Sequence, residues 1–168
     1  SRYLKAWRDY QRLERLKVSS ILLMACVWHA YGEIGGRELP PREDERLLRV
    51  VELMPGFLRG TVQNPACTEE DLNRIPEESR DEVADAFEGL AAVLRTVVDN
   101  CEDAREAVRL LRRAFGARVP DRPDLVSIVP TATTDLASPA VVQAAAAAVA
   151  AQPKRVVAAP NVGRSRSG

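Results

Sequence analysis

Residues 17–31 read KVSSILLMACVWHAY, and this stretch decides the fold class of the chain. A serine side chain can accept a hydrogen bond from an unpaired backbone N–H, so Ser19-Ser20 predicts the start of a helix. The run from Ile21 to Trp28 is apolar on every side of that helix, which we expect to extend to about Tyr31. A helix without a polar face has to be buried on all sides.

The residues before this stretch predict another helix, over 2–17. Apolar residues recur at three- and four-residue spacing along one face (Tyr3, Leu4, Trp7, Tyr10, Leu13), and basic residues recur along a second face (Lys5, Arg8, Arg12, Arg15). If the two helices form a hairpin, the basic face of the first lies near the start of the second.

Further helices are expected after a glycine- and proline-rich loop over 32–41. They cover 43–58, ended or kinked by Pro55-Gly56, then 76–100, and then 102–115, stopped by Gly116. Residues 60–68 read as a loop, and 68–73 as a short helix with an acidic first turn. The fold class is therefore mainly α, a helical bundle over residues 1–124.

The composition changes at Leu125. Ala, Val, Pro, Ser and Thr dominate from there on, and no aromatic residue follows. We interpret 125–168 as a flexible Ala/Pro-rich C-terminal tail.

The overall composition excludes several classes of protein. The chain has 24 basic and 24 acidic residues in 168, so it lacks the strong positive charge of a protein that binds long nucleic acids. No apolar run, Ile21 to Trp28 included, is longer than eight residues, far short of the roughly 20 residues of a membrane helix, so no membrane partner is expected. Three scattered cysteines form neither a disulfide framework nor a zinc motif, and favour a reducing, cytoplasmic location.

Most residues able to carry chemistry are better explained structurally. The single histidine, His29, reads as a hydrogen-bonded core residue, and the cysteines as small buried apolar residues. The acidic runs 43–45 and 69–71 each hold carboxylates two residues apart, but both lie at expected helix starts, where acidic residues offset the helix dipole. No phosphate-binding glycine loop or nucleophile motif is present, so neither a catalytic nor a metal site is assigned.

One group of residues points to an anion. Lys5 lies on the first helix, and Ser19 opens the second one 14 residues later. In a helical hairpin the Lys5 ammonium, the Ser19 hydroxyl and the backbone N–H groups of the second helix could converge on a phosphate, with Arg8 one turn beyond Lys5. From the residues alone, a solvent-exposed basic face explains the same pattern.

Several short motifs resemble one known family. They are Tyr3–Arg8 (YLKAWR), Lys17–Met24 (KVSSILLM), Gly60–Pro65 (GTVQNP), Leu72–Arg74 (LNR) and Phe115–Pro120 (FGARVP). In order and spacing they are similar to the cGAS/DncV-like nucleotidyltransferases, especially the DncV-like branch. These bacterial enzymes make cyclic di- or oligonucleotide second messengers in anti-phage defence. The resemblance covers about residues 2–124.

The resemblance implies a fold and a site. Family enzymes have an α/β nucleotidyltransferase core of the polymerase-β-like kind, which carries the acidic Mg²⁺ ligands, and a helical lobe packed against it. This chain matches the helical C-terminal lobe, so ATP and GTP are the implied substrates and Mg²⁺ the implied cofactor, bound by the core. Lys5 and Ser19 match the lysine and serine that contact the triphosphate, and Arg8 is implied to line the same cleft. Relatives carry an aromatic residue where this chain has Ser20, and a glutamate where it has Leu23, so no base preference is implied.

The two ends of the sequence add expectations. The chain begins at Ser1, inside a helical pattern and without Met, so we expect a piece of a longer protein that is inactive by itself. In many such defence systems an E1/E2-like ligase conjugates the synthase through its C-terminal glycine, which Gly168 would supply; an arbitrary flexible end is the alternative. A non-catalytic helical interaction module and another polymerase-β-like nucleotidyltransferase remain open as alternative functions.

Overall fold

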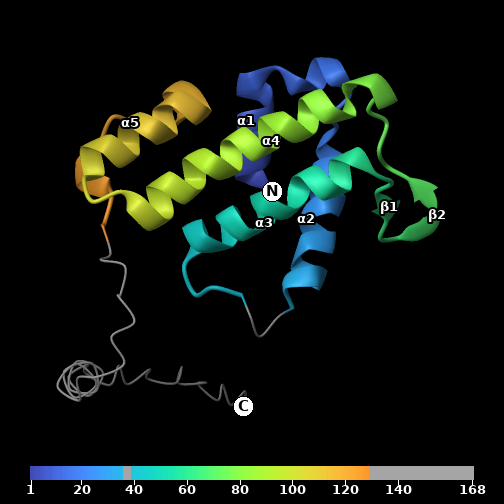
Figure 1. Ribbon diagram of the computed structural model, residues 1–168, viewed down its shortest axis with the longest axis horizontal. Coiled ribbons are helices and arrows are strands. Elements are labelled where there is room, and N and C mark those ends of the chain that lie inside the picture. Colours follow the sequence, from blue (N-terminus) through green and yellow to red (C-terminus); the bar gives the residue numbers. More distant parts are fainter. Residues whose placement is uncertain (36–38, 129–168) are drawn as a thin grey trace, which may run out of the picture. The chain divides into compact units, whose positions relative to one another are not determined.

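The first 34 residues form the expected helical hairpin (Figure 1). In the computed structural model, which describes residues 1–35 and 39–128, α1 spans Arg2–Gln11, a 3-10 turn covers Leu13–Leu16, and α2 spans Ser20–Ile34. The single helix predicted over 2–17 is therefore wrong in its length. Arg12 takes a left-handed conformation (φ 57°), which ends α1 and turns the chain toward α2.

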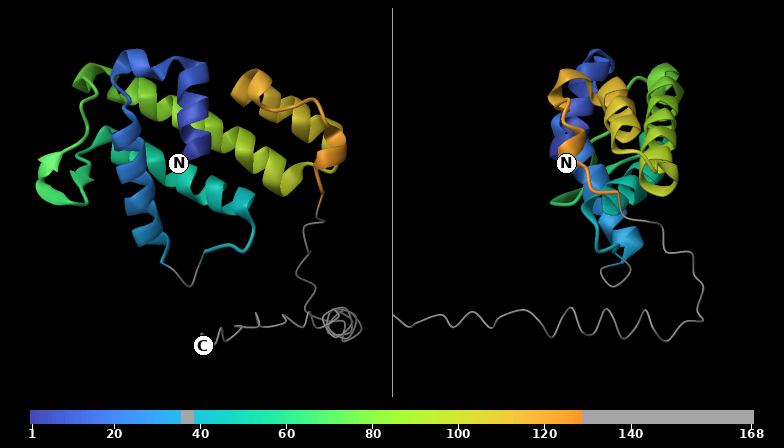
Figure 2. Two further views of the ribbon diagram at one scale, coloured as in Figure 1. Left: turned by 180° about the vertical axis from the view of Figure 1, so that it is seen from behind. Right: turned by 90° about the vertical axis from the view of Figure 1, so that its left-hand side faces the viewer.

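Two long helices pack side by side behind the hairpin (Figure 2). Helix α3 spans Glu43–Arg59, and α4 spans Arg80–Arg95 after a short 3-10 turn at Glu77–Ser79 and continues as a π-helical turn over Thr96–Asn100. The helix predicted over 43–58 is confirmed to within one residue, but Pro55-Gly56 does not end it, because α3 continues through Pro55 to Arg59. Proline has no N–H, so the helix loses one hydrogen bond at Pro55, which is buried.

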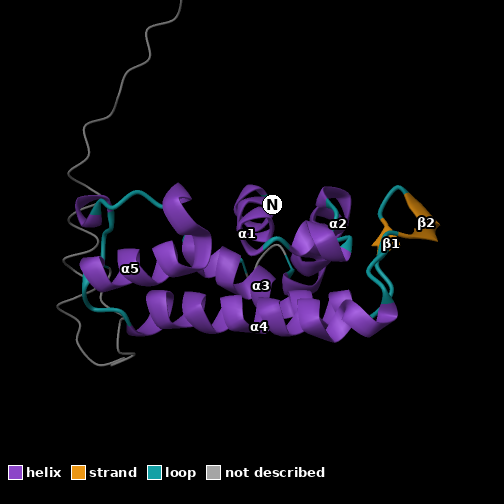
Figure 3. Cartoon of the chain, turned by 90° about the horizontal axis from the view of Figure 1, so that it is seen from above, coloured by secondary structure: helices purple, strands orange, loops and turns teal. Residues whose placement is uncertain are grey.

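A small hairpin connects α3 to α4. Strand β1 (Gln63–Asn64) pairs antiparallel with β2 (Cys67–Asp71), and Figure 3 shows the pair projecting past the helices at one end. The short helix predicted over 68–73 is therefore wrong. The Asp71 carboxylate accepts the N–H groups of Val62 (3.0 Å) and Asn73 (2.8 Å), and Leu72 donates to the Val62 carbonyl (2.8 Å). These bonds tie both ends of the hairpin together, which no short-range pattern within 68–73 encodes.

The fold closes with α5 (Ala104–Phe115), followed by 3-10 turns at Gly116–Arg118 and Pro123–Leu125. The stop predicted at Gly116 is confirmed, with φ at 69°. One apolar core runs between the helices, and within it the rings of Trp7 and Phe87 meet edge to face at 4.6 Å. The predicted mainly α fold class is confirmed. The part of the predicted tail from residue 129 on, including Gly168, lies outside the described residues.

Candidate functional site

Ser19 is the N-cap of α2, as its position in the sequence predicts. Its side-chain Oγ accepts a hydrogen bond from the backbone N–H of Leu22 at 3.1 Å, and its own backbone is extended. A hydroxyl has one proton to donate as well as lone pairs to accept. Within the described part of the chain no acceptor for that proton is found, so the capped hydroxyl can still donate to an external oxygen.

Lys5 of α1 lies against the second turn of α2. Its Nζ contacts Sδ of Met24 at 3.5 Å, and the side chain is only partly exposed. A thioether is a weak acceptor, and an ammonium has three protons to donate. Among residues 1–35 and 39–128 no carboxylate pairs with Lys5, although 14 ion pairs engage other basic residues. Lys5 therefore brings an unmatched positive charge to α2.

Arg8, one turn along α1 from Lys5, bridges α1 to the start of α2. Its Nη1 donates to the Val18 carbonyl (3.2 Å) and to Oγ of Ser20 (3.0 Å), while its Nε donates to the Asp9 carboxylate (2.9 Å). Unlike Lys5, Arg8 has a carboxylate partner, and its donors are mostly engaged within the protein.

The hairpin therefore brings the three predicted binding residues to the first two turns of α2. Lys5 reaches α2 at Met24, four residues beyond the Ser20 contact of Arg8. Four residues correspond to about 6 Å along a helix axis. The first turn of α2 also presents unpaired backbone N–H groups and the positive end of the helix dipole. Together these groups can bind an oxyanion, with Lys5 as the cation.

The two acidic runs have structural partners. Arg42 pairs with Asp44 and, at 3.4 Å, with Glu45, which confirms a helix-start role for 43–45 in α3. Burial raises the pKa of the Asp44 carboxyl, but the hydrogen bond and charge of Arg42 outweigh it and leave that pKa below its usual value. The run 69–71 lies in β2 rather than at a helix start, and Oδ1 of Asp71 accepts hydrogen bonds from two backbone N–H groups. Residues 1–35 and 39–128 contain no cluster of three metal-ligating side chains.

The prediction that His29 is a hydrogen-bonded core residue and that the cysteines are small buried apolar residues is confirmed only in part. Nε2 of His29 lies 2.8 Å from the Gln63 carbonyl oxygen, so the ring is hydrogen-bonded as predicted, but it is half-buried rather than in the core. Cys26 is buried, and burial raises the pKa of its thiol to about 12. Cys67 is exposed and Cys101 is half-buried, so the prediction of a buried apolar role is wrong for these two.

The largest departure from the expected burial is on α2. One face carries four exposed large apolar side chains, Ile21, Met24, Trp28 and Tyr31, of which Trp28 is 59% exposed. We call these four residues the α2 stripe. The opposite face of α2 is buried, so the described residues cover this all-apolar helix on one side only. Their spacing of three, four and three residues was the available signal, hidden because nearly all the residues between them are apolar as well.

Comparisons with known proteins give one match. The model of the family described as "Cyclic GMP-AMP synthase, C-terminal domain" matches residues 1–128. Neither the curated proteins nor the solved structures give a match. In the described part of the chain, no helix combines the length and the apolar character needed to cross a bilayer.

Proposed function

Because this chain belongs to the family of cyclic GMP-AMP synthase C-terminal domains, we propose that it is the helical part of a nucleotidyltransferase that makes cyclic di- or oligonucleotides from ATP and GTP. The nucleotidyltransferase parent follows from the family; the cyclic product, the role in anti-phage defence and the cytoplasmic location are proposals. The parent reaction is attack of a ribose hydroxyl on an α-phosphate, with pyrophosphate as the leaving group.

One observation carries the proposal: the partly exposed ammonium of Lys5 has no carboxylate partner among the described residues and contacts Met24 in the second turn of α2, the helix that Ser19 caps. In this proposal Lys5 neutralises the triphosphate and orients the donor nucleotide, and the Ser19 hydroxyl donates to a phosphate oxygen. Charge-assisted hydrogen bonds of this kind are about twice as strong as neutral ones.

The residues described here do not fit a Mg²⁺ ion, because their carboxylates are paired or separated and form no ligand cluster. The proposal therefore assigns Mg²⁺ to the core of the parent and uses Lys5 and Ser19 only to bind and orient phosphate. The α2 stripe is the proposed contact face for that core, because an exposed apolar face of this kind marks an interface. A ligase acting on Gly168 also belongs to the proposal, and that residue lies outside the described part.

The same stripe supports a second candidate, a non-catalytic module that buries the α2 stripe in a partner protein. The two functions differ at Lys5, since a purely apolar interface does not require a cation that lacks a carboxylate partner among the described residues.

Nucleotide binding and turnover test the proposal. ATP should bind to this chain, and Lys5→Ala and Ser19→Ala should each weaken binding, whereas removal of the exposed Arg105 cation on α5 by Arg105→Ala should not. In the full-length parent with Mg²⁺ and labelled ATP, GTP, CTP and UTP, Lys5→Ala should lower the yield of phosphatase-resistant product by about tenfold or more, equivalent to about 1.4 kcal/mol of transition-state stabilisation. Normal turnover by a folded Lys5→Ala enzyme would remove Lys5 from the site, and this chain alone should make no product.

A further inference from the structure

The Arg8 side chain is mostly buried, and most of its hydrogen-bond donors are engaged within the protein, which does not suit a direct ligand of phosphate. Only 13% of its side chain is exposed. The edge of the guanidinium formed by Nε and Nη2 donates to Oδ1 of Asp9 at 2.9 and 2.5 Å, and Nη1 points the other way, to Val18 and Ser20. The positive charge of Arg8 is thus balanced by Asp9, and most of its N–H donors already make hydrogen bonds within the protein.

The two partners of Nη1 lie on either side of Ser19. One bond ends on the Val18 carbonyl before it, and the other on the Ser20 hydroxyl after it. Ser19 itself needs an extended backbone (φ −79°, ψ 159°) to direct its Oγ to the Leu22 N–H. Because a guanidinium is planar and rigid, two bonds from one nitrogen restrain both flanks of the cap together.

Asp9 sets the direction in which Arg8 faces. Its Oδ1 takes the Nε–Nη2 edge, which leaves only Nη1 for the α2 start. The other oxygen, Oδ2, lies 3.8 Å from Nη2 of Arg118 in the closing turn after α5. Asp9 therefore connects the turn after α5 to the guanidinium that restrains the cap.

We infer that Arg8 and Asp9 are positioning residues for the proposed phosphate site: Arg8 acts through Ser19 rather than on the nucleotide, and Asp9 orients Arg8. The link to phosphate rests on the proposed function. The structural half of the inference, that Asp9 orients Arg8 and that Arg8 restrains Ser19, does not. Lys5 is then the cation that meets the phosphates, and the Arg8–Asp9 pair orders the hydroxyl beside it.

Amide hydrogen exchange without ligand tests the structural half on the complete chain. The readout is the Leu22 amide, which donates to Ser19 Oγ. Arg8→Ala and the milder Asp9→Asn should speed its exchange by about fivefold or more through local opening, with the amide of Phe87 in the core unchanged. Arg109→Ala is the matched control, because Arg109 makes a similar contact with Glu106 on α5. Unchanged Leu22 exchange in the folded Asp9→Asn chain overturns the inference.

A double-mutant cycle tests the link to phosphate, with inorganic tripolyphosphate as the probe. Arg8→Ala and Ser19→Ala should each weaken binding by about tenfold, the scale of one lost hydrogen bond to a charged group. Combined, they should weaken it no more than about twofold beyond Ser19→Ala, because residues that act through one another are not additive. Additive losses overturn the inference, since direct contact of Arg8 with phosphate and a general loss of folded protein both produce them.

The two tests separate this inference from the proposed function. If Leu22 exchange responds but the unsubstituted chain does not bind tripolyphosphate, the proposed phosphate site is wrong and the positioning role for it is overturned as well. If tripolyphosphate binds through Lys5 and Ser19 while Leu22 exchange is unchanged, the proposed function stands and the positioning role of Arg8 is wrong.

Discussion

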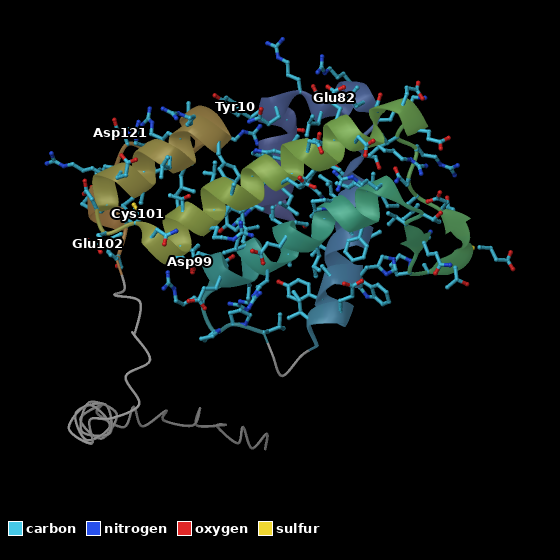
Figure 4. The ribbon with its side chains drawn as sticks, in the orientation of Figure 1. Tyr10, Glu82, Asp99, Cys101, Glu102 and Asp121 are labelled. Atoms are coloured by element: carbon cyan, nitrogen blue, oxygen red, sulfur yellow. The ribbon has the colours of Figure 1, made fainter. Side chains whose placement is uncertain are left out.

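The ring of Tyr10 fills the space beside Gly116, so that a Cβ atom added to this glycine would lie 2.4 Å from Cε2 of the ring. Tyr10 is in the last turn of α1, and Gly116 ends α5; Figure 4 labels Tyr10 next to that end of α5. The side-chain amide of Gln11 donates to the neighbouring Ala114 carbonyl at 3.1 Å. The first and last helices are thus closed against each other at a position that admits no side chain.

Gly116→Ala should therefore destabilise the chain. The backbone at Gly116 (φ 69°, ψ −151°) is a conformation that only glycine adopts readily, and it should cost alanine about 1–3 kcal/mol before any displacement of Tyr10. Urea unfolding measures the change in the free energy of unfolding.

Gly89→Ala is the matched control. Gly89 is an exposed residue inside α4 with nothing within 4 Å of an added Cβ, so this substitution should stabilise the chain by about 0.5–1 kcal/mol. Equal effects of the two substitutions would contradict the arrangement at Gly116.

Asn73→Asp should be more damaging than its nearly identical shape suggests. Asn73 is the one buried polar residue of the described core, and its Nδ2 donates to the carbonyls of Leu58 (2.9 Å) and Gly60 (2.6 Å). A carboxylate would place an acceptor against both carbonyls, at a cost above about 3 kcal/mol at pH 7. Protonation restores one donor, so thermal unfolding should show a smaller loss at pH 4.

Asn100→Asp serves as the control for Asn73→Asp, since Asn100 is exposed. It should change stability by less than about 0.5 kcal/mol. A tolerated Asn73→Asp would mean that the turn before α4 does not depend on these two hydrogen bonds.

The three cysteines should differ in reactivity with a thiol reagent at pH 8. Burial raises the pKa of Cys26 to about 12, so this thiol stays protonated, whereas the exposed Cys67 should react first. Mass spectrometry of timed samples shows the order of labelling, and labelling of Cys26 as fast as Cys67 in the native state would contradict its burial.

The same shift makes stability depend on alkaline pH. Between the ordinary thiol pKa and about 12, the unfolded state loses the Cys26 proton while the folded state keeps it, so stability falls as pH rises. Cys26→Ala should be less stable at neutral pH because it leaves a small cavity, but it should lose less stability between pH 9 and 11. Parallel losses in the two proteins would show that Cys26 does not titrate in this way.

Acrylamide should quench the fluorescence of Trp28 more strongly than that of Trp7. Trp28 is 59% exposed and Trp7 only 3%, so Trp28→Phe should remove the quenched emission and Trp7→Phe should leave it. In the full-length parent, packing of the catalytic core on the α2 stripe should protect Trp28 from acrylamide. Equal quenching of Trp28 in the parent and in this chain would contradict that contact.

Local patterns predicted the helices well where the cause was local. Ser19 caps α2 because its hydroxyl reaches an N–H three residues away, and Gly116 ends α5 because it tolerates a positive φ. Both causes lie within a few residues of sequence. The approach of Lys5 to α2 was likewise predictable once a hairpin was assumed, because the 14 residues from Lys5 to Ser19 span two short helical segments and a turn.

Other features depend on contacts between distant residues. The acidic run 69–71 forms a strand because Asp71 and Leu72 bond to Val62, and α3 passes through Pro55, which is buried. The partners of Arg8 could not be predicted from the sequence either. The sequence pattern of a basic residue on a helix face is the same whether that residue contacts solvent, a carboxylate or a nucleotide.

The sequence by itself determined the helical class, the start of α2 and the residue types available for a phosphate, because capping and helical periodicity act over one or two turns. Only the tertiary structure decided that Lys5 has no carboxylate partner among the described residues, that Arg8 bonds to Asp9 and to the residues on both sides of Ser19, and that the α2 stripe stays exposed. Burial and charge pairing are properties of the surroundings that folding assembles, and the local sequence does not contain those surroundings.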